Sequence, residues 1–281
     1  MKHIPVLLDR VLNALGDISG KTVVDCTFGA GGYSRAFLNA GANVIAFDRD
    51  SNVVADANAM IAEFGDRFRF IPQTFSHISE LECNVDAIVF DLGISSMQID
   101  VASRGFSFRF DAPLDMRMSA DGMTAAELID RLSVTELADI LYKYGDVKKS
   151  GILAKAIKDK LPQTTFELRD LIYNPNDIAP VFQALRIAVN DEMGELERAL
   201  SVVPSLLHVG GKCVCVTFHS LEDRIVKNTF RTWTTPLGDP RMPVLQPAPF
   251  ELIRAQTPSD TELENNSRAR SAHMRGVIKR I

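Results

Sequence analysis

Two features of residues 22–50 are suited to binding a nucleotide-like ligand. Glycines stand at positions 29, 31 and 32, shortly after an apolar run that ends in Asp25. Glycine lets the backbone turn tightly and approach a ligand without a Cβ in the way, and the free N–H groups of a following helix attract electron-rich ligand atoms. Asp48 ends the next apolar run, where an acid accepts hydrogen bonds from ribose hydroxyls. The pattern predicts a βαβ unit that cradles a nucleotide-containing cofactor.

The glycine spacing helps to separate two classes of cofactor. A dinucleotide-binding loop has the form G-x-G-x-x-G, but the last glycine position of this loop is Ser34. S-adenosylmethionine carries no phosphate, so a loop that wraps its amino-acid tail needs only adjacent glycines. The spacing therefore favours S-adenosylmethionine over a dinucleotide, with a simple tight turn between strand and helix as the alternative.

Alternating strands and helices must position these residues. Short apolar runs predict strands at 23–25, 44–48, 68–71, 87–91 and 212–217, and residues 51–64 predict a helix. Strands that alternate with helices indicate an α/β fold with a parallel, doubly wound sheet. Strand patterns are missing between 101 and 188, where helical patterns take over. We expect an α/β domain formed by residues 1–100 and 189–281, with an all-helical domain inserted at 101–188.

Polar residues follow two of the predicted strands. Ligands of such sheets bind outside the carboxyl ends of the strands. Asp91 ends the fourth strand, where an acid is suited to hold an amino group of a cofactor or substrate, and His219 follows the strand at 212–217. The alternative is structural: Asp91 caps a turn, and Ser220 with Asp223 forms a helix capping box.

Composition limits the class of protein. The 281 residues carry a net charge of -5, which argues against indiscriminate coating of nucleic acid. We expect a cytoplasmic protein, because we find no signal peptide and no apolar run of the length that spans a membrane. The four cysteines show no C-x-x-C spacing, so neither a disulfide nor a metal site is expected. Residues 266–281 are basic, and either contact phosphates or form a solvated strand.

Eight sequence blocks point to one family. The chain resembles the bacterial 16S ribosomal RNA (cytosine-N(4))-methyltransferase family (RsmH, formerly MraW) over nearly its whole length. The family's signature blocks match, in order, residues 3–8, 27–35, 91–96, 104–108, 113–118, 182–187, 218–224 and 268–271.

This resemblance implies a class I S-adenosylmethionine-dependent methyltransferase, with a Rossmann-like doubly wound sheet and a helical insertion for substrate recognition. The implied reaction methylates the exocyclic amine of a cytidine in the decoding region of 16S ribosomal RNA, within the small ribosomal subunit, with S-adenosylmethionine as donor. By motif, the implied donor-binding residues are Gly31, Gly32, Tyr33, Asp48, Phe75, Asp91 and Gln98. Phe75 is expected to pack on the adenine.

Three residues are candidates for substrate contact. Asp115 and Arg117 stand in the 113–118 block, and His219 follows a strand. The target base must leave its stack before its amine is methylated, which suits a flipped or single-stranded cytidine. A structural role is the alternative for each: Asp115 and Arg117 pair to pin the insertion, and His219 is a satisfied residue at a helix entry. The sequence identifies no general base.

Two stretches of the insertion depart from the family pattern. Residues 144–148 read Tyr-Gly-Asp-Val-Lys where the family usually has Tyr-Gly-Glu-Glu-Arg, and residues 177–181 replace a usual Pro-Ala-Thr-Arg. These changes leave open a weakened contact to the ribosomal target or a shifted substrate. Two other functions compete: a noncatalytic, donor-binding ribosome-assembly factor, and a nicotinamide-dependent oxidoreductase, which Ser34 disfavours.

Overall fold

The computed structural model describes residues 5–236 and 246–281, so part of the proline-rich loop expected at 234–249 lies outside the described residues. The chain divides into two compact units. The first comprises Met1–Gly93 and Gly194–Ile281, and the second comprises Ile94–Met193. The second unit thus begins before and ends after the 101–188 insertion that the sequence patterns indicate.

A seven-stranded sheet forms the centre of the first unit, in the order β3-β2-β1-β4-β5-β7-β6. Neighbouring strands from β3 to β5 are parallel, whereas β7 runs antiparallel to β5 and β6 antiparallel to β7. The strands are β1 (Thr22–Asp25), β2 (Asn43–Phe47), β3 (Phe68–Ile71), β4 (Val85–Asp91), β5 (Leu207–Thr217), β6 (Phe250–Gln256) and β7 (His273–Lys279). This order, with its antiparallel C-terminal edge, is that of the class I S-adenosylmethionine-dependent methyltransferases, and it confirms the predicted fold class.

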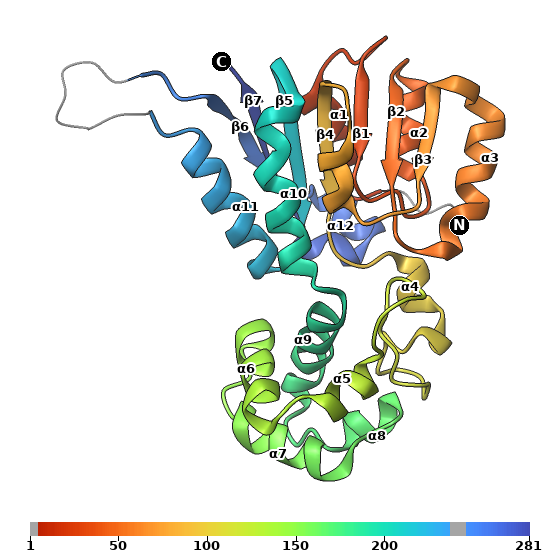
Figure 1. Ribbon diagram of the computed structural model, residues 1–281, viewed down its shortest axis with the longest axis vertical. Helices are drawn as coiled ribbons and strands as arrows, with labels where there is room; N and C mark the ends of the chain where they lie inside the picture. Colours follow the sequence, from red (N-terminus) through yellow and green to blue (C-terminus); the bar gives the residue numbers. More distant parts are fainter. Residues whose placement is uncertain (1–4, 237–245) are drawn as a thin grey trace. The chain divides into compact units, whose positions relative to one another are not determined.

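Helices cover both faces of this sheet (Figure 1). Along β4, Ile88 and Phe90 join a core with residues of the helices α10 and α11, whereas Ala87 and Val89 are buried on the opposite face. This alternation is the period of two that a strand buried on both faces imposes. The helices of the unit are α1 (Leu8–Leu15), α2 (Gly32–Asn39), α3 (Val54–Phe64), α10 (Glu192–Leu206, from Gly194 on), α11 (Ser220–Trp233) and α12 (Asp260–Asn265), with short 3-10 turns η1 (Ser51–Val53), η2 (Gly65–Arg67), η3 (Phe75–Glu80) and η6 (Ser267–Ser271).

The second unit is helical and has its own apolar core. Leu137, Leu141, Ile157, Leu168 and Leu185 are all fully buried in it. Three of its helices begin with a capping box in which a Ser or Thr hydroxyl and a Glu carboxylate satisfy the free N–H groups of the first turn. The helices are α4 (Ser96–Asp100), α5 (Ala125–Arg131), α6 (Val134–Gly145), α7 (Ser150–Lys160), α8 (Thr165–Asp170) and α9 (Ile178–Asn190), with 3-10 turns η4 (Ala102–Arg104) and η5 (Pro175–Asp177).

The basic C-terminal segment forms an internal strand. The strand at His273–Lys279 is confirmed, but it lies between β5 and β6 with Met274, Gly276 and Val277 buried, so the expectation that it is solvated is wrong. Arg275 donates to both carboxylate oxygens of Asp223 at 2.7 and 2.9 Å, and Lys279 donates to the carbonyls of Pro204 and Leu207. These two cations serve to attach β7 to neighbouring elements. Over the described part of the chain, no helix has the length and apolar character needed to cross a bilayer.

Candidate donor-binding site

Gly31 and Gly32 of the loop between β1 and α2 leave no room for a side chain. Gly31 has a φ of +74°, and a Cβ on it would lie 2.7 Å from Met60 Cε and 2.9 Å from Phe28 Cζ. A Cβ on Gly32 would overlap Pro5 Cγ. Gly32 is the first residue of α2, whose initial N–H groups have no acceptor within the helix. The loop therefore brings unshielded backbone N–H groups to the carboxyl edge of the sheet.

Three carboxylates end the central strands. Asp25 is fully buried at the end of β1, where it accepts a hydrogen bond from Ser34 Oγ at 2.7 Å. Asp48 follows β2 and accepts from the backbone N–H groups of Gly29 and Asp50, both at 2.8 Å. Asp91 ends β4, and its Oδ1 is enclosed without a hydrogen-bond partner among the described residues. The adjacent strands β2, β1 and β4 thus carry one acid each.

Burial affects the protonation of all three acids. Burial raises the pKa of Asp25 to about 6, although the hydrogen bonds to its carboxylate oppose this shift. Burial also raises the pKa of Asp48 above its usual value. For Asp91, burial together with the charges of Asp25 and Glu222 places the pKa well above the ordinary range. Clustered buried carboxylates favour a cationic partner, because a positive charge offsets both the desolvation and the mutual repulsion. The electrostatics of this edge therefore suit a ligand that carries ammonium or sulfonium charge.

The side chain of Tyr33 is used internally. Its hydroxyl donates to the carbonyl of Val6, and the residue is 3% exposed. Burial, together with the charges of nearby acids, raises the pKa of Tyr33 well above its usual value, so the hydroxyl stays protonated. Of the groups on Tyr33, the backbone N–H in the first turn of α2 is the one suited to contact a ligand.

Phe75 follows β3 at the start of η3. Its ring packs edge-on against Phe90, with ring centroids 5.7 Å apart, and the side chain is only partly buried against the apolar core. One part of the ring is therefore fixed by the core while another part remains accessible. This arrangement is suited to stacking on a flat heterocycle.

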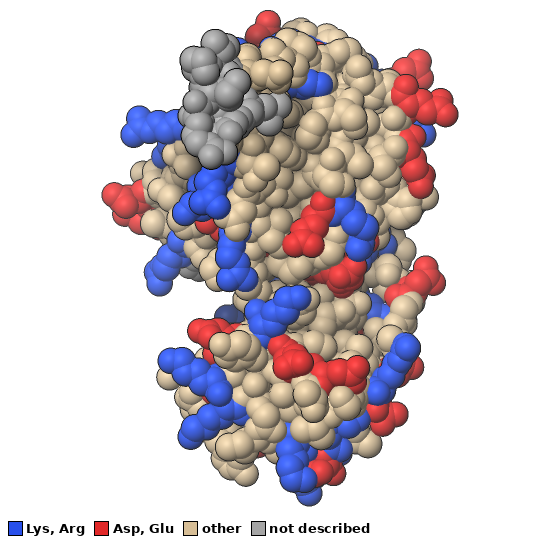
Figure 2. Space-filling model, turned by 60° about the vertical axis from the view of Figure 1, so that its left-hand side comes forward, with Lys and Arg blue, Asp and Glu red and all other residues tan. Residues whose placement is uncertain are grey.

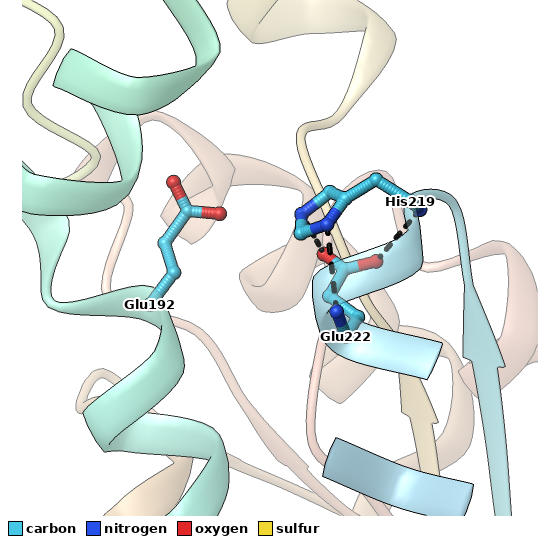
Figure 3. A group of neighbouring side chains, drawn as sticks. All are labelled: Glu192, His219 and Glu222. Carbon is cyan, nitrogen blue, oxygen red and sulfur yellow. Dashed lines mark hydrogen bonds and ion pairs between the residues drawn. The ribbon is translucent and has the colours of Figure 1, made fainter. Parts of the chain in front are cut away.

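His219 lies at the entrance to α11. Figure 3 shows its ring beside the carboxylate of Glu222, with His219 Nε2 3.0 Å from Glu222 Oε1. His219 Nδ1 accepts from the backbone N–H of Glu222, so the capping box consists of His219 and Glu222 rather than the predicted Ser220 and Asp223. Glu222 is 2% exposed and also accepts from the backbone N–H of Phe218 at 2.8 Å. His219 Nε2 is enclosed and makes no bond of good geometry within the described residues.

The remaining candidates belong to the second unit. Gln98 is buried, and its Oε1 accepts from the backbone N–H of Ser95 at 3.0 Å. Arg117 binds Asp115 through two hydrogen bonds of 2.8 and 2.9 Å, and it also donates to the carbonyls of Ala120 and Gly122. The Asp115–Arg117 pair therefore stabilises the loop that contains it, while each side chain keeps 27% exposure. This guanidinium lowers the pKa of Asp115.

The sequence interpretation missed three residues that support these sites. The sequence patterns mark Asp25 only as the end of a strand and Glu222 only as part of a block. No sequence pattern marks Asn190, although it bridges the backbone of Met116 and Met118 with hydrogen bonds of 2.8 and 2.7 Å. An acid directly before a glycine turn is a local signal for Asp25, but the partners of Asn190 lie more than seventy positions away along the chain.

Known proteins resemble this chain over nearly its whole length. The family model described as the MraW methylase family matches residues 1–281. The "Ribosomal RNA small subunit methyltransferase H" of Gluconobacter oxydans is 46% identical over 299 residues, covering 98% of this chain and 93% of that protein. The proteins of the same name from Agrobacterium fabrum and Rhizobium johnstonii are 45% and 44% identical, with 99% of this chain covered and 87% and 88% of theirs. The chain therefore belongs to the MraW methylase family.

Proposed function

We propose that this protein transfers a methyl group from S-adenosylmethionine to the exocyclic amine of a cytidine in the decoding region of small-subunit ribosomal RNA, within the cytoplasmic small ribosomal subunit. The observation that carries the proposal is the buried, unpaired Oδ1 of Asp91 at the edge that also holds the glycine loop. Family membership supports the type of reaction, and the names of the relatives support the class of substrate.

The proposed roles of the donor-site residues follow from their chemistry. S-adenosylmethionine supplies a methyl group activated by a sulfonium centre. The N–H groups of Gly32 and Tyr33 face its amino-acid carboxylate, and Asp48, with lone pairs left on both oxygens, accepts from the ribose hydroxyls. Phe75 packs on the adenine. Asp91 holds a positively charged or N–H group through its unpaired oxygen. We propose Gln98 as a further residue that contacts S-adenosylmethionine.

The cytidine amine is a poor nucleophile, because its lone pair is delocalised into the ring. The site must therefore align the amine with the methyl group, and alignment of this kind supplies several kcal/mol of the rate enhancement. We assign alignment of the flipped base to His219 and to the Asp115–Arg117 pair. His219 is held by Glu222, and Arg117 is fixed by Asp115, so both side chains are preorganised.

The two stretches that depart from the family pattern support an intact second unit. A Cβ on Gly145 would lie 2.7 Å from the carbonyl oxygen of Pro180, and Gln183 donates to the carbonyl of Tyr144 at 3.1 Å. The end of α6 and the start of α9 therefore pack closely, and each departing stretch lies against the other. Tyr144 and Gly145, which make these contacts, keep the family pattern, and this favours a retained structure and with it retained substrate recognition by residues 94–193.

On the face shown in Figure 2, basic and acidic side chains are interspersed. No broad basic surface appears on that face, which agrees with the net charge of -5. We therefore expect recognition of a folded RNA target to depend on shape and specific contacts, with a weak contribution from nonspecific phosphate binding.

The test is a methyl-transfer assay. The purified protein is incubated with S-adenosylmethionine labelled in its methyl group and with small ribosomal subunits from cells that lack this modification, and the RNA is then digested to nucleosides. We expect label in cytidine methylated on its exocyclic amine. Naked ribosomal RNA serves as the comparison substrate. Donor binding without any labelled nucleoside would overturn the enzymatic proposal and leave a noncatalytic assembly factor.

A further inference from the structure

Glu195 is a buried carboxylate near the start of α10 that none of the roles above uses. It is 9% exposed. One of its oxygens, Oε1, accepts from Arg198 Nη2 at 2.8 Å, whereas Oε2 is enclosed and receives no hydrogen bond from the residues that the structure describes. Leaving a buried carboxylate oxygen without a donor is unfavourable. A ligand with an N–H group would remove this cost.

The surroundings of Glu195 connect it to the proposed adenine site. Its carboxylate interacts with the hydroxyls of Thr74 and Ser76, the two residues that flank Phe75. The Thr74 hydroxyl lies 3.0 Å from Ser76 Oγ and 2.9 Å from His77 Nδ1, so a small polar network surrounds the backbone of Phe75. Glu195 therefore lies beside the segment that presents the Phe75 ring.

The charge of Glu195 limits what it can bind. Burial raises the pKa of its carboxyl, but the nearby hydroxyl of Ser76, the hydrogen bond from Arg198 and the nearby hydroxyl of Thr74 together outweigh this effect, and the pKa lies below its usual value. The group is therefore ionised at neutral pH and acts only as an acceptor. Its unpaired oxygen calls for a hydrogen-bond donor on the ligand.

We propose that Glu195 Oε2 accepts a hydrogen bond from the 6-amino group of the donor's adenine and thereby selects adenine over a 6-oxo purine. The 6-amino group is the one N–H donor of the adenine ring, whereas a 6-oxo purine places an acceptor at the same position and is repelled by the carboxylate. This inference rests on the proposed function, in which the adenine packs against Phe75.

The experiment compares two ligands that differ at this position. The dissociation constants of S-adenosylhomocysteine and S-inosylhomocysteine are measured by calorimetry for the wild type, Glu195→Gln and Glu197→Gln. Glu197 lies on the same helix with an exposed side chain, so its variant is the matched control. The amide of Glu195→Gln is able to donate to a 6-oxo group. We expect this variant to lower the preference for the adenosyl ligand by about tenfold or more, and Glu197→Gln to leave it unchanged.

The ratio of the two constants separates recognition from a supporting role. If Glu195→Gln weakened the binding of both ligands by the same factor, Glu195 would only hold the loop around Phe75, and the inference would be wrong. An unchanged ratio with unchanged affinities would likewise overturn it. If the wild type bound neither ligand, the proposed donor site would fail as well, and this outcome is distinct from the other two. The ratio does not depend on the fraction of folded protein.

Discussion

The acids at the carboxyl edge of the sheet oppose folding and favour ligand binding. Asp25, Asp48 and Asp91 end adjacent strands, and burial raises the pKa of each. Burying a carboxylate costs free energy unless a cation or a set of donors compensates it. In Asp91 this compensation is incomplete, because Oδ1 has no partner within the described chain. A cationic donor that binds Asp91 would remove this cost, and the complex would be stabilised by the same free energy.

Replacing Asp91 with Asn should therefore change stability and affinity in opposite directions. The amide keeps the shape of the side chain but carries no charge to desolvate, so we expect unchanged or increased thermal stability without ligand. The dissociation constant for S-adenosylmethionine should rise by about ten- to a hundredfold, as expected for a lost charged hydrogen bond. Thermal unfolding and calorimetry measure the two effects. A large loss of stability together with unchanged affinity would assign Asp91 to the fold alone.

Asp25 should make stability depend on pH. Its pKa is raised from 3.8 to about 6, so between these values the folded protein binds more protons than the unfolded chain. The contribution of Asp25 to the free energy of unfolding is therefore lost as pH rises from about 4 to 7. The free energy of unfolding of Asp25→Asn, measured relative to that of the wild type, should therefore increase by on the order of 2 kcal/mol between pH 4 and pH 7.

Urea unfolding of both proteins at several pH values measures this difference, and titrating groups that do not interact with Asp25 cancel in the comparison. The amide oxygen is still able to accept from Ser34, which keeps the local hydrogen bond. A difference in stability that stays constant over this range would show that the pKa of Asp25 is close to that of an ordinary exposed acid.

At the scale of elements, two glycines of the loop between β1 and α2 distinguish the cost of a positive φ from the cost of a steric collision. Gly29 and Gly31 both have positive φ values, +53° and +74°. A Cβ on Gly29 would have as its nearest neighbour the Thr27 carbonyl oxygen at 3.9 Å, whereas one on Gly31 would overlap Met60 and Phe28. Gly29→Ala therefore introduces backbone strain alone, and Gly31→Ala introduces strain and a collision.

We expect Gly29→Ala to lower the free energy of unfolding by about 1 kcal/mol. Gly31→Ala should cost about 1–3 kcal/mol more, because packed cores respond strongly to inserted atoms, and it should also weaken donor binding. Chemical unfolding and calorimetric titration of the two variants provide the measurements. Equal losses in both would mean that Met60 and Phe28 move aside without cost.

The elements that the sequence predicted well are those with local signals. The glycine turn, the acid after β2 and the periodic helix over 51–64 each depend on neighbouring residues, and the structure contains all three, with a 3-10 turn at Ser51–Val53 before α3. The antiparallel pairing of β7 with β5 was not predicted, because it joins Thr217 to His273 across more than fifty positions. Glu195 has no local signal for the same reason: the hydroxyls of Thr74 and Ser76, which lie near its carboxylate, belong to a distant segment.

At the scale of the whole molecule, the chain contains two units with separate cores. The core of the second unit includes residues near both of its ends: Ile94 and Val189 pack against it. Asn190 joins the backbone of Met116 and Met118, and Glu192 receives two hydrogen bonds from Arg186 at 2.8 and 2.9 Å. All of these contacts lie within residues 94–193, so we expect this segment to contain what it needs to fold.

Two fragments of the second unit test this expectation. A fragment of residues 94–193 keeps Asn190 and the Arg186–Glu192 pair, whereas a fragment of residues 101–188, the extent suggested by the sequence patterns, lacks Ile94, Asn190 and Glu192. Loss of the buried hydrogen bonds of Asn190 and of the partner of a nearly buried arginine should each cost about 1–3 kcal/mol. We expect cooperative urea unfolding for the longer fragment and a much less stable or unfolded shorter one, measured by circular dichroism. Equal stability of the two would place the folding boundary inside α9, and an unfolded longer fragment would show that residues 94–193 depend on the rest of the chain.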